Sequence, residues 1–225
     1  MFLFFDPTMV FVLPALAFAF YAQYKVKSTY AKYAKVNSIK GLSGAEAARQ
    51  ILVRNNLSVK VEEQSGFLTD YYDPKNKVLK LSSDVYHGRS ISALGVAAHE
   101  VGHALQDQNK YMPMNIRSSI VPAANIGSTM AFPLFFIGFF FKAGVFMDIG
   151  ILFFSLVVLF HLVTLPVEFN ASKRAMVTLE NNGFLASQEI KYGRKVLNAA
   201  ALTYVAATAV AAIHLIRFLI LRNNR

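Results

Sequence analysis

Cysteine is absent from the 225-residue chain, so disulfide bonds, thiolate metal ligands and a cysteine nucleophile are all excluded. Acidic residues are scarce as well, because 13 Asp and Glu stand against 23 Lys and Arg, for a formal net charge of +10. Such a balance can indicate nucleic-acid binding. Here many basic residues cluster at the ends of long apolar stretches, which favours a membrane instead. The sequence therefore predicts a lipid bilayer as partner and no nucleic acid.

Apolar residues are what the chain has in excess. They make up 55% of it, with 20 Phe, and the mean hydropathy is +0.39. Such a chain is too apolar for an ordinary soluble domain. Four stretches approach the roughly 20 apolar residues that a bilayer core requires, and they cover residues 2–21, 119–141, 145–166 and 199–220. The sequence therefore predicts a mainly α-helical, multi-pass cell-membrane protein with about four transmembrane helices.

The distribution of basic residues predicts the orientation. No Lys or Arg precedes position 25, and the first apolar stretch is followed by Lys25, Lys27, Lys32 and Lys35. The positive-inside rule then places this side in the cytoplasm. The predicted organisation is a transmembrane helix (1–24), a cytoplasmic α+β unit (25–118), a transmembrane hairpin (119–166), a cytoplasmic segment (167–198), and a fourth transmembrane helix with a tail (199–225). Arg222 and Arg225 would then end outside, so a C-terminal segment lying in the membrane interface is the alternative.

Residues 25–118 show the pattern of a small α+β unit. Ser43 and Glu46 form a capping box that opens a helix, which we expect to end near Asn55. Apolar and polar residues alternate over 57–61, and 67–72 and 77–81 are two further candidate strands. The run Asp-Pro-Lys-Asn at 73–76 predicts a turn between the last two strands. Gly183 is expected at a helix end in the second cytoplasmic segment.

One short motif in the α+β unit carries chemistry. His99 and His103 stand four residues apart, with Glu100 directly after the first histidine. The flanking residues favour a helix, on which positions i and i+4 share a face. Both imidazoles could then bind one metal ion, with Glu100 placed to take a proton from the bound water. This is the HExxH arrangement of zinc-dependent peptidases, and the alternative is a helix surface whose polar residues coincide by chance.

A catalytic zinc site needs a third protein ligand. Glu168 is the candidate, because it directly follows the third apolar stretch. The second and third stretches together return the chain to the membrane face that holds His99 and His103, so the site is expected close to the inner membrane surface. The alternative is a juxtamembrane charge on Glu168 that pairs with Lys173 or Arg174.

These motifs resemble those of a known family. The HExxH run at 98–104, with Glu-Phe-Asn-Ala at 168–171, looks like a membrane-embedded zinc metallopeptidase of the gluzincin kind. The chain is similar to the YugP-type membrane peptidase family over nearly its whole length, including residues 72–74, 79–82, 85–86, 88 and 97–100. A more distant resemblance is to the HtpX-type membrane proteases. Those carry an acidic residue four positions after the third ligand, where this chain has Ser172.

The resemblance implies a role for each motif residue. His99, His103 and Glu168 would bind one catalytic Zn²⁺, and Glu100 would act as general base and then as proton donor to the leaving amine. The α+β unit would be zincin-like. Its strand at 77–81 would be the sheet edge that holds an extended peptide by backbone hydrogen bonds.

Motif and resemblance together predict an integral membrane zinc endopeptidase with its active site on the cytoplasmic face. It would hydrolyse peptide bonds in peptides or in exposed segments of membrane proteins, and the family analogy suggests protein quality control. One alternative is a non-catalytic membrane scaffold that binds a structural metal or none. Another is a zinc-dependent hydrolase of lipidated substrates. Glu100 distinguishes the peptidase from the scaffold, because a structural metal site does not need a general base whereas hydrolysis does.

Overall fold

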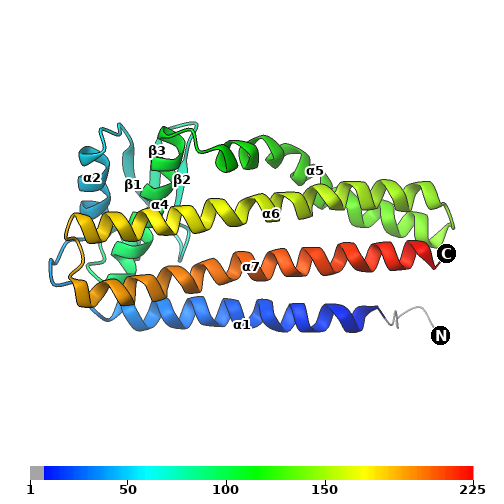
Figure 1. The fold of residues 1–225 in the computed structure, drawn as a ribbon, viewed down its shortest axis with the longest axis horizontal. Coiled ribbons are helices and arrows are strands. Elements are labelled where there is room, and N and C mark those ends of the chain that lie inside the picture. The colour runs from blue at the N-terminus through cyan, green and yellow to red at the C-terminus, as the bar shows by residue number, and fades with distance from the viewer. Residues whose placement is uncertain (1–7, 225) are drawn as a thin grey trace. The chain divides into compact units, whose positions relative to one another are not determined.

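The computed structural model describes residues 8–224 and is mainly helical, with one small sheet (Figure 1). Residues 1–7 and 225, which belong to the predicted first transmembrane helix and to the tail, lie outside the described residues. The chain divides into two compact units. We call residues 8–23, 115–166 and 203–224 the membrane unit, and residues 24–114 and 167–202 the site unit.

Within residues 8–224, four helices are long and apolar enough to cross a membrane, as the composition predicts. They are α1 (Met9–Ala34), α5 (Met112–Phe140), α6 (Gly144–Asn181) and α7 (Ser187–Asn223). Each extends beyond its predicted span, because the apolar pattern marks only the part of a helix that suits a bilayer. Prolines inside these helices, including Pro166 of α6, do not end them, which is common in membrane helices.

The core of the membrane unit is aromatic. Phe135 of α5 and Phe218 of α7 are fully buried and stack with ring centroids 4.0 Å apart. Phe154 of α6 packs against Phe218 at 5.2 Å. Such contacts supply the van der Waals packing that helix association in a membrane depends on.

The site unit contains the small helices and the sheet. Helix α2 (Gly44–Arg54) opens with the predicted capping box, in which the Glu46 carboxylate accepts from the Ser43 N–H at 2.7 Å and the Ser43 hydroxyl accepts from the Glu46 N–H at 3.2 Å. The apolar face of α2 is buried and packs on helix α4 (Ile91–Gln108). A short helix, α3 (Ser83–Tyr86), leads from the sheet towards α4.

The three strands are shifted relative to the sequence pattern. They are β1 (Lys60–Gln64), β2 (Tyr71–Asp73) and β3 (Val78–Ser82). Strand β1 starts later than predicted because the N–H of Leu57 is bound to the carbonyl of Leu52, at the end of α2. Strand β2 is shortened because Gly66 and Leu68 both have positive φ, which breaks extended backbone.

The predicted edge strand is not an edge. The sheet order is β1-β3-β2, so β3 lies in the middle, parallel to β1 and antiparallel to β2. The expectation that residues 77–81 form an open edge was therefore wrong. The physical reason is burial, since Leu79 and Leu81 are fully buried and a buried strand is paired on both sides. Strand β2 is the edge that packs on α4.

The β2–β3 hairpin is held against the C-terminal part of α4. At the predicted turn, the Asp73 carboxylate accepts from the backbone N–H groups of Lys75 and Asn76. The Tyr72 hydroxyl donates to the Asp107 carboxylate at 2.6 Å, and Lys77 forms an ion pair with the same carboxylate. These contacts fix edge strand β2 next to the helix that carries the HExxH motif.

Candidate metal centre

Helix α4 presents both motif histidines on one face. It begins after Ser90, whose hydroxyl accepts from the N–H of Ala93 at 3.2 Å, and this N-cap fixes the start of the helix. Most of the helix is buried. His99 and His103 are one turn apart, with ring centroids separated by 4.8 Å. The i and i+4 spacing therefore places two imidazoles side by side, as the sequence predicts.

Close packing of α4 on α6 brings the third residue to this face. A Cβ atom on Gly102 would lie only 2.6 Å from the carbonyl oxygen of Ala171 on α6. Any larger residue at position 102 would thus push the two helices apart. The absence of a side chain there lets α6 approach closely enough to place Glu168 over the histidines.

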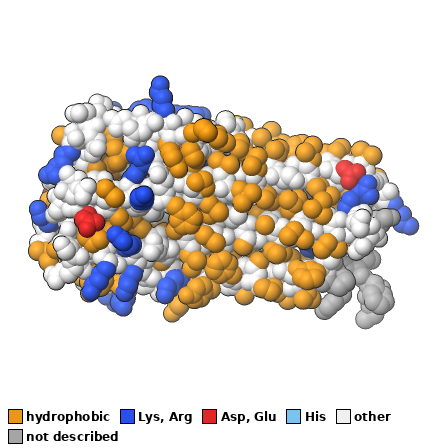
Figure 2. All heavy atoms as spheres, viewed as in Figure 1, with side chains coloured by type: hydrophobic (Ala, Val, Ile, Leu, Met, Phe, Trp, Pro, Cys, Tyr) orange, Lys and Arg blue, Asp and Glu red, His pale blue; other side chains and the backbone are white. Residues whose placement is uncertain are grey.

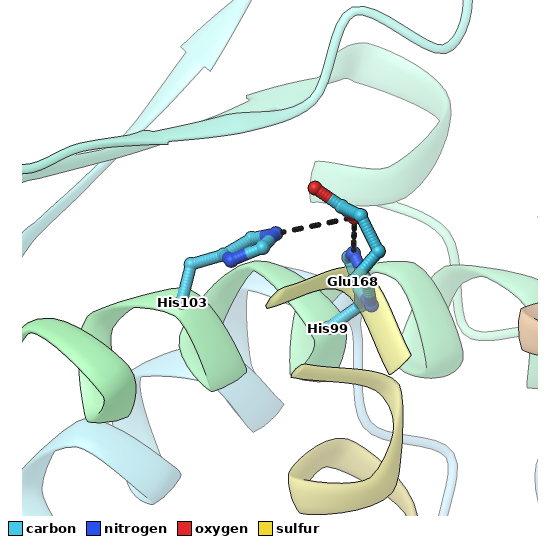
Figure 3. A group of neighbouring side chains, drawn as sticks. All are labelled: His99, His103 and Glu168. Carbon is cyan, nitrogen blue, oxygen red and sulfur yellow. Dashed lines mark hydrogen bonds and ion pairs between the residues drawn. The ribbon is translucent and has the colours of Figure 1, made fainter. Parts of the chain in front are cut away.

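Three ligand atoms converge in the buried space between these helices (Figure 3). The Oε2 atom of Glu168 lies 3.2 Å from Nε2 of His99 and 3.6 Å from Nε2 of His103. The side chains are 4% exposed for Glu168, 12% for His99 and 11% for His103. All three ligand atoms lie within 4.8 Å of one another.

This arrangement fits a zinc ion. Two imidazoles and one carboxylate are a donor set of catalytic zinc sites, which keep a fourth position for water. Ligand atoms at about 2.0–2.1 Å from a tetrahedral zinc are separated from each other by roughly 3.3 Å. The two observed separations from Glu168, 3.2 and 3.6 Å, lie on either side of this value.

Hydrogen bonds on the far side of each imidazole leave the Nε2 atoms for the metal. Nδ1 of His99 lies 3.1 Å from the hydroxyl of Ser172, and Nδ1 of His103 lies 3.0 Å from Oε1 of Gln106. Metal-binding histidines generally donate their other N–H to such a partner, which fixes the tautomer and the ring orientation. Ser172 thus contacts a histidine although it is not the acidic residue found in the distant family.

The partner of His103 belongs to a longer chain of hydrogen bonds. The side-chain amide of Gln106 is fully buried and donates to the backbone carbonyl of Val167 at 2.7 Å and to Oδ1 of Asn170 at 3.0 Å. Arg174 donates to the same Oδ1 atom at 2.7 Å. The orientation of His103 on α4 is therefore linked to residues on both sides of Glu168 on α6.

Glu100 is buried, with 8% of its surface exposed. Burial raises the pKa of its carboxyl above the ordinary value, although the neighbouring His99 and His103 act in the opposite direction. For His103, burial lowers the pKa, but the hydrogen bond that its imidazole donates to Glu168 and the negative charges of Glu100 and Glu168 outweigh it, so the pKa is raised. Glu100 directly follows His99 on α4, which places it within electrostatic reach of the clustered residues.

The structure thus brings His99, His103 and Glu168 together and places Glu100 beside them. Of the two alternative partners for Glu168, Lys173 and Arg174, the second donates to Asn170. Sequence reasoning missed Gln106 and Asn170. The position of Gln106 three residues after His103 on one helix was the available signal, whereas the contact with Asn170 depends on packing between distant segments.

Comparisons with known proteins agree with this geometry. A family model described as "Putative neutral zinc metallopeptidase" matches residues 8–223. The chain is 49% identical over 214 residues to a Bacillus subtilis (strain 168) protein described as "Putative membrane protease YugP", a match that covers 94% of this chain and 95% of the relative. No solved structure matches the chain.

Proposed function

The chain belongs to the family of neutral zinc metallopeptidases whose model matches it, and from this premise we propose that it is a membrane-bound zinc endopeptidase. The observation that carries the proposal is the convergence of His99, His103 and Glu168 beside a buried Glu100. A structural metal site would need protein ligands but no general base such as Glu100.

In this proposal, zinc is held by Nε2 of His99, Nε2 of His103 and the carboxylate of Glu168. When bound, zinc would polarise the carbonyl of the scissile peptide bond and would lower the pKa of a bound water to about 7. Ser172 orients the ring of His99 through Nδ1, and the amide oxygen of Gln106 holds His103 in the tautomer that leaves Nε2 free. The close packing of α4 on α6 at Gly102 keeps Glu168 near enough to the two histidines to share a metal ion with them.

Glu100 is the proposed proton carrier. It would accept a proton from the attacking water and then donate it to the amine that leaves when the peptide bond breaks, so that its own charge is restored after each cycle. Burial raises its pKa, which makes its carboxylate a better proton acceptor than an exposed one.

Strand β2 is the proposed substrate platform. It is an edge of the three-stranded sheet within the described residues, and it packs on the motif helix α4. An extended peptide could pair with its outer backbone groups and so be held along α4. This would select unfolded or exposed segments, because a folded domain offers no free strand of backbone.

The proposed orientation places the site unit in the cytoplasm. The support is the concentration of lysines directly after the apolar stretch of α1, which the positive-inside rule assigns to the inner face. Helix α6 contains both an apolar stretch that suits a bilayer and Glu168. We infer that the substrates are cytoplasmic segments of membrane proteins or peptides near the membrane, with protein quality control as the role suggested by the family.

The test compares the full-length protein with Glu100→Gln and with Glu180→Gln, an exposed glutamate on α6. Each is purified in detergent, assayed for bound zinc, and incubated with an unfolded membrane-protein substrate. We expect one zinc in all three proteins and cleavage by the unmodified protein and Glu180→Gln. Glu100→Gln should cleave about 10²–10⁴-fold more slowly. Zinc in all three without cleavage by any would favour the scaffold function and contradict the peptidase, whereas equal cleavage by all three would contradict the proposed role of Glu100.

A further inference from the structure

A cavity lies in the site unit, between α1 and α7. Its volume is about 410 Å³, and it is separate from the group of His99, His103 and Glu168. Its polar lining consists of Lys25, Thr29, Lys32 and Tyr33 of α1 with Lys195 and Asn198 of α7. None of these residues has a part in the proposed hydrolysis.

The lining is positively charged and contains no carboxylate. Lys25 and Lys32 are two helical turns apart on α1, so they face the same direction at a spacing of about 10 Å. Lys195 faces them from α7. Among residues 8–224, no acidic side chain forms an ion pair with any of these three lysines. Three ammonium groups around one cavity repel each other unless an anion lies between them.

Neutral hydrogen-bond donors complete the lining. Thr29 and Tyr33 offer hydroxyl groups, and Asn198 offers a side-chain amide. Tyr33 is only 5% exposed, and its ring stacks on that of Tyr192 with centroids 5.2 Å apart, which fixes this side of the cavity. Ammonium, hydroxyl and amide groups together match the oxygens of a phosphate.

The location of the cavity points to a membrane phosphate. Lys25 lies four residues after the end of the apolar stretch of α1, and Lys195 lies four residues before Ala199, where the apolar stretch of α7 begins. Ala199 and Leu202 also line the cavity, at its apolar end. Figure 2 shows hydrophobic side chains gathered over the apolar parts of the long helices and Lys and Arg side chains over the parts of α1 and α7 that belong to the site unit. An apolar surface that is followed by a surface rich in basic residues and tyrosine is typical of the level of the lipid headgroups in a bilayer.

We propose that the cavity between α1 and α7 binds the phosphate of an anionic phospholipid headgroup, with the acyl chains lying along the apolar stretches of the two helices. A soluble anion would use the lysines alone. A lipid also uses Ala199 and Leu202, which explains why the basic cavity opens at the start of an apolar helix segment. The proposal does not depend on the metal centre.

The test measures binding of phosphatidylglycerol to the full-length protein in detergent by native mass spectrometry, with phosphatidylcholine and inorganic phosphate as comparison ligands. The first variant replaces the three lining lysines by glutamine (Lys25→Gln, Lys32→Gln, Lys195→Gln). The matched control replaces three exposed lysines of the same segments that do not line the cavity (Lys27→Gln, Lys35→Gln, Lys191→Gln). A third variant keeps the charge, with arginine at the three lining positions.

We expect the unmodified protein to retain one phosphatidylglycerol in preference to phosphatidylcholine. The lining glutamine variant should bind it about tenfold or more weakly than the control variant, because both lose the same net charge but only one loses the site. The arginine variant should retain binding. Equal weakening in the lining and control variants would overturn the proposal in favour of diffuse surface attraction. Displacement of the lipid by an equal concentration of inorganic phosphate would also overturn it, in favour of a soluble anion.

Discussion

Nδ1 of His103 and Oε1 of Gln106 lie 3.0 Å apart on consecutive turns of α4. The same Gln106 side chain is fully buried and donates to the backbone of Val167 on α6. Because an amide oxygen only accepts, Nδ1 of His103 carries the proton and Nε2 is left with its lone pair. Gln106 therefore sets the tautomer of one proposed ligand and anchors it to the helix of another.

Replacing Gln106 by methionine tests this positioning role. Gln106→Met keeps the volume but removes the acceptor for His103 and leaves the Val167 carbonyl without its donor. We expect zinc affinity to fall about 10–100-fold and the free energy of unfolding to fall by about 1–3 kcal/mol. Zinc affinity is measured by competition with a chelating dye. The control is Gln108→Met, two residues along on the exposed surface; equal zinc affinities in the two variants would contradict the role of Gln106.

The two glycines of α4 give a matched pair for the helix contact. A Cβ on Gly102 would lie 2.6 Å from the Ala171 carbonyl oxygen, whereas a Cβ on Gly95 meets nothing within 4 Å. We expect Gly102→Ala to destabilise the protein by about 1–3 kcal/mol and to lose bound zinc, because Glu168 moves away from the histidines. Gly95→Ala should stabilise by about 0.5–1 kcal/mol, since alanine restricts the unfolded chain.

Denaturant unfolding and zinc content of the two alanine variants measure this difference. The expectation is an effect of opposite sign on stability and a loss of zinc in one variant only. If both variants kept their zinc and differed little in stability, then α4 and α6 would not be held as closely as the structure indicates.

Removing the metal should lower stability. Glu168 is buried and its Oε2 atom contacts both histidines, and a buried carboxylate needs compensating positive charge. At a free zinc concentration about 1,000-fold above the dissociation constant, binding adds about 4 kcal/mol to the free energy of unfolding. We expect a chelator to lower the thermal midpoint and added zinc to restore it. The midpoint of Glu168→Ala should respond to neither; a chelator effect of the same size in that variant would point to a metal site elsewhere.

Local features could be predicted from the sequence because neighbouring residues determine them. The capping box of Ser43 and Glu46, the turn at Asp73 and the positive-φ Gly183 just after α6 follow from the spacing of a few residue types. The four long helices follow from apolar length alone. Glu168 was indicated by its position after an apolar stretch, and it does lie beside His99 and His103.

Features that join distant segments could not be predicted in the same way. The pattern of residues 77–81 suggests a strand but not which strands lie on either side of it, and so β3 was expected at an edge and lies in the middle. The bond from Gln106 to Asn170 spans 64 residues and requires the close approach of α4 and α6 at Gly102. Nothing in the local sequence around either residue specifies that approach.

Asp70 makes part of the stability of the site unit dependent on pH. Ser82 donates to its carboxylate through the backbone N–H at 2.8 Å and through the hydroxyl at 3.0 Å. Burial nevertheless raises the pKa of Asp70 above 3.8, and the hydrogen bonds from Ser82 only partly oppose it. A folded-state pKa above the unfolded value means that the folded protein holds this proton more tightly. The contribution of Asp70 to stability is therefore most favourable below pH 3.8 and is lost as the pH rises through the folded pKa.

Asp70→Asn should remove this dependence. Asparagine keeps an oxygen that accepts from the N–H of Ser82 but does not ionise. We expect the stability of the variant relative to the unmodified protein to become more favourable as the pH is raised from 3.8 through the folded pKa of Asp70, because only the unmodified protein then buries a carboxylate charge. Thermal midpoints of both proteins are measured across this range with a chelator present, so that proton release on zinc binding does not contribute. A constant difference between the two midpoints, or one that moves against the variant as the pH rises, would show that hydrogen bonds from Ser82 rather than burial control the pKa of Asp70.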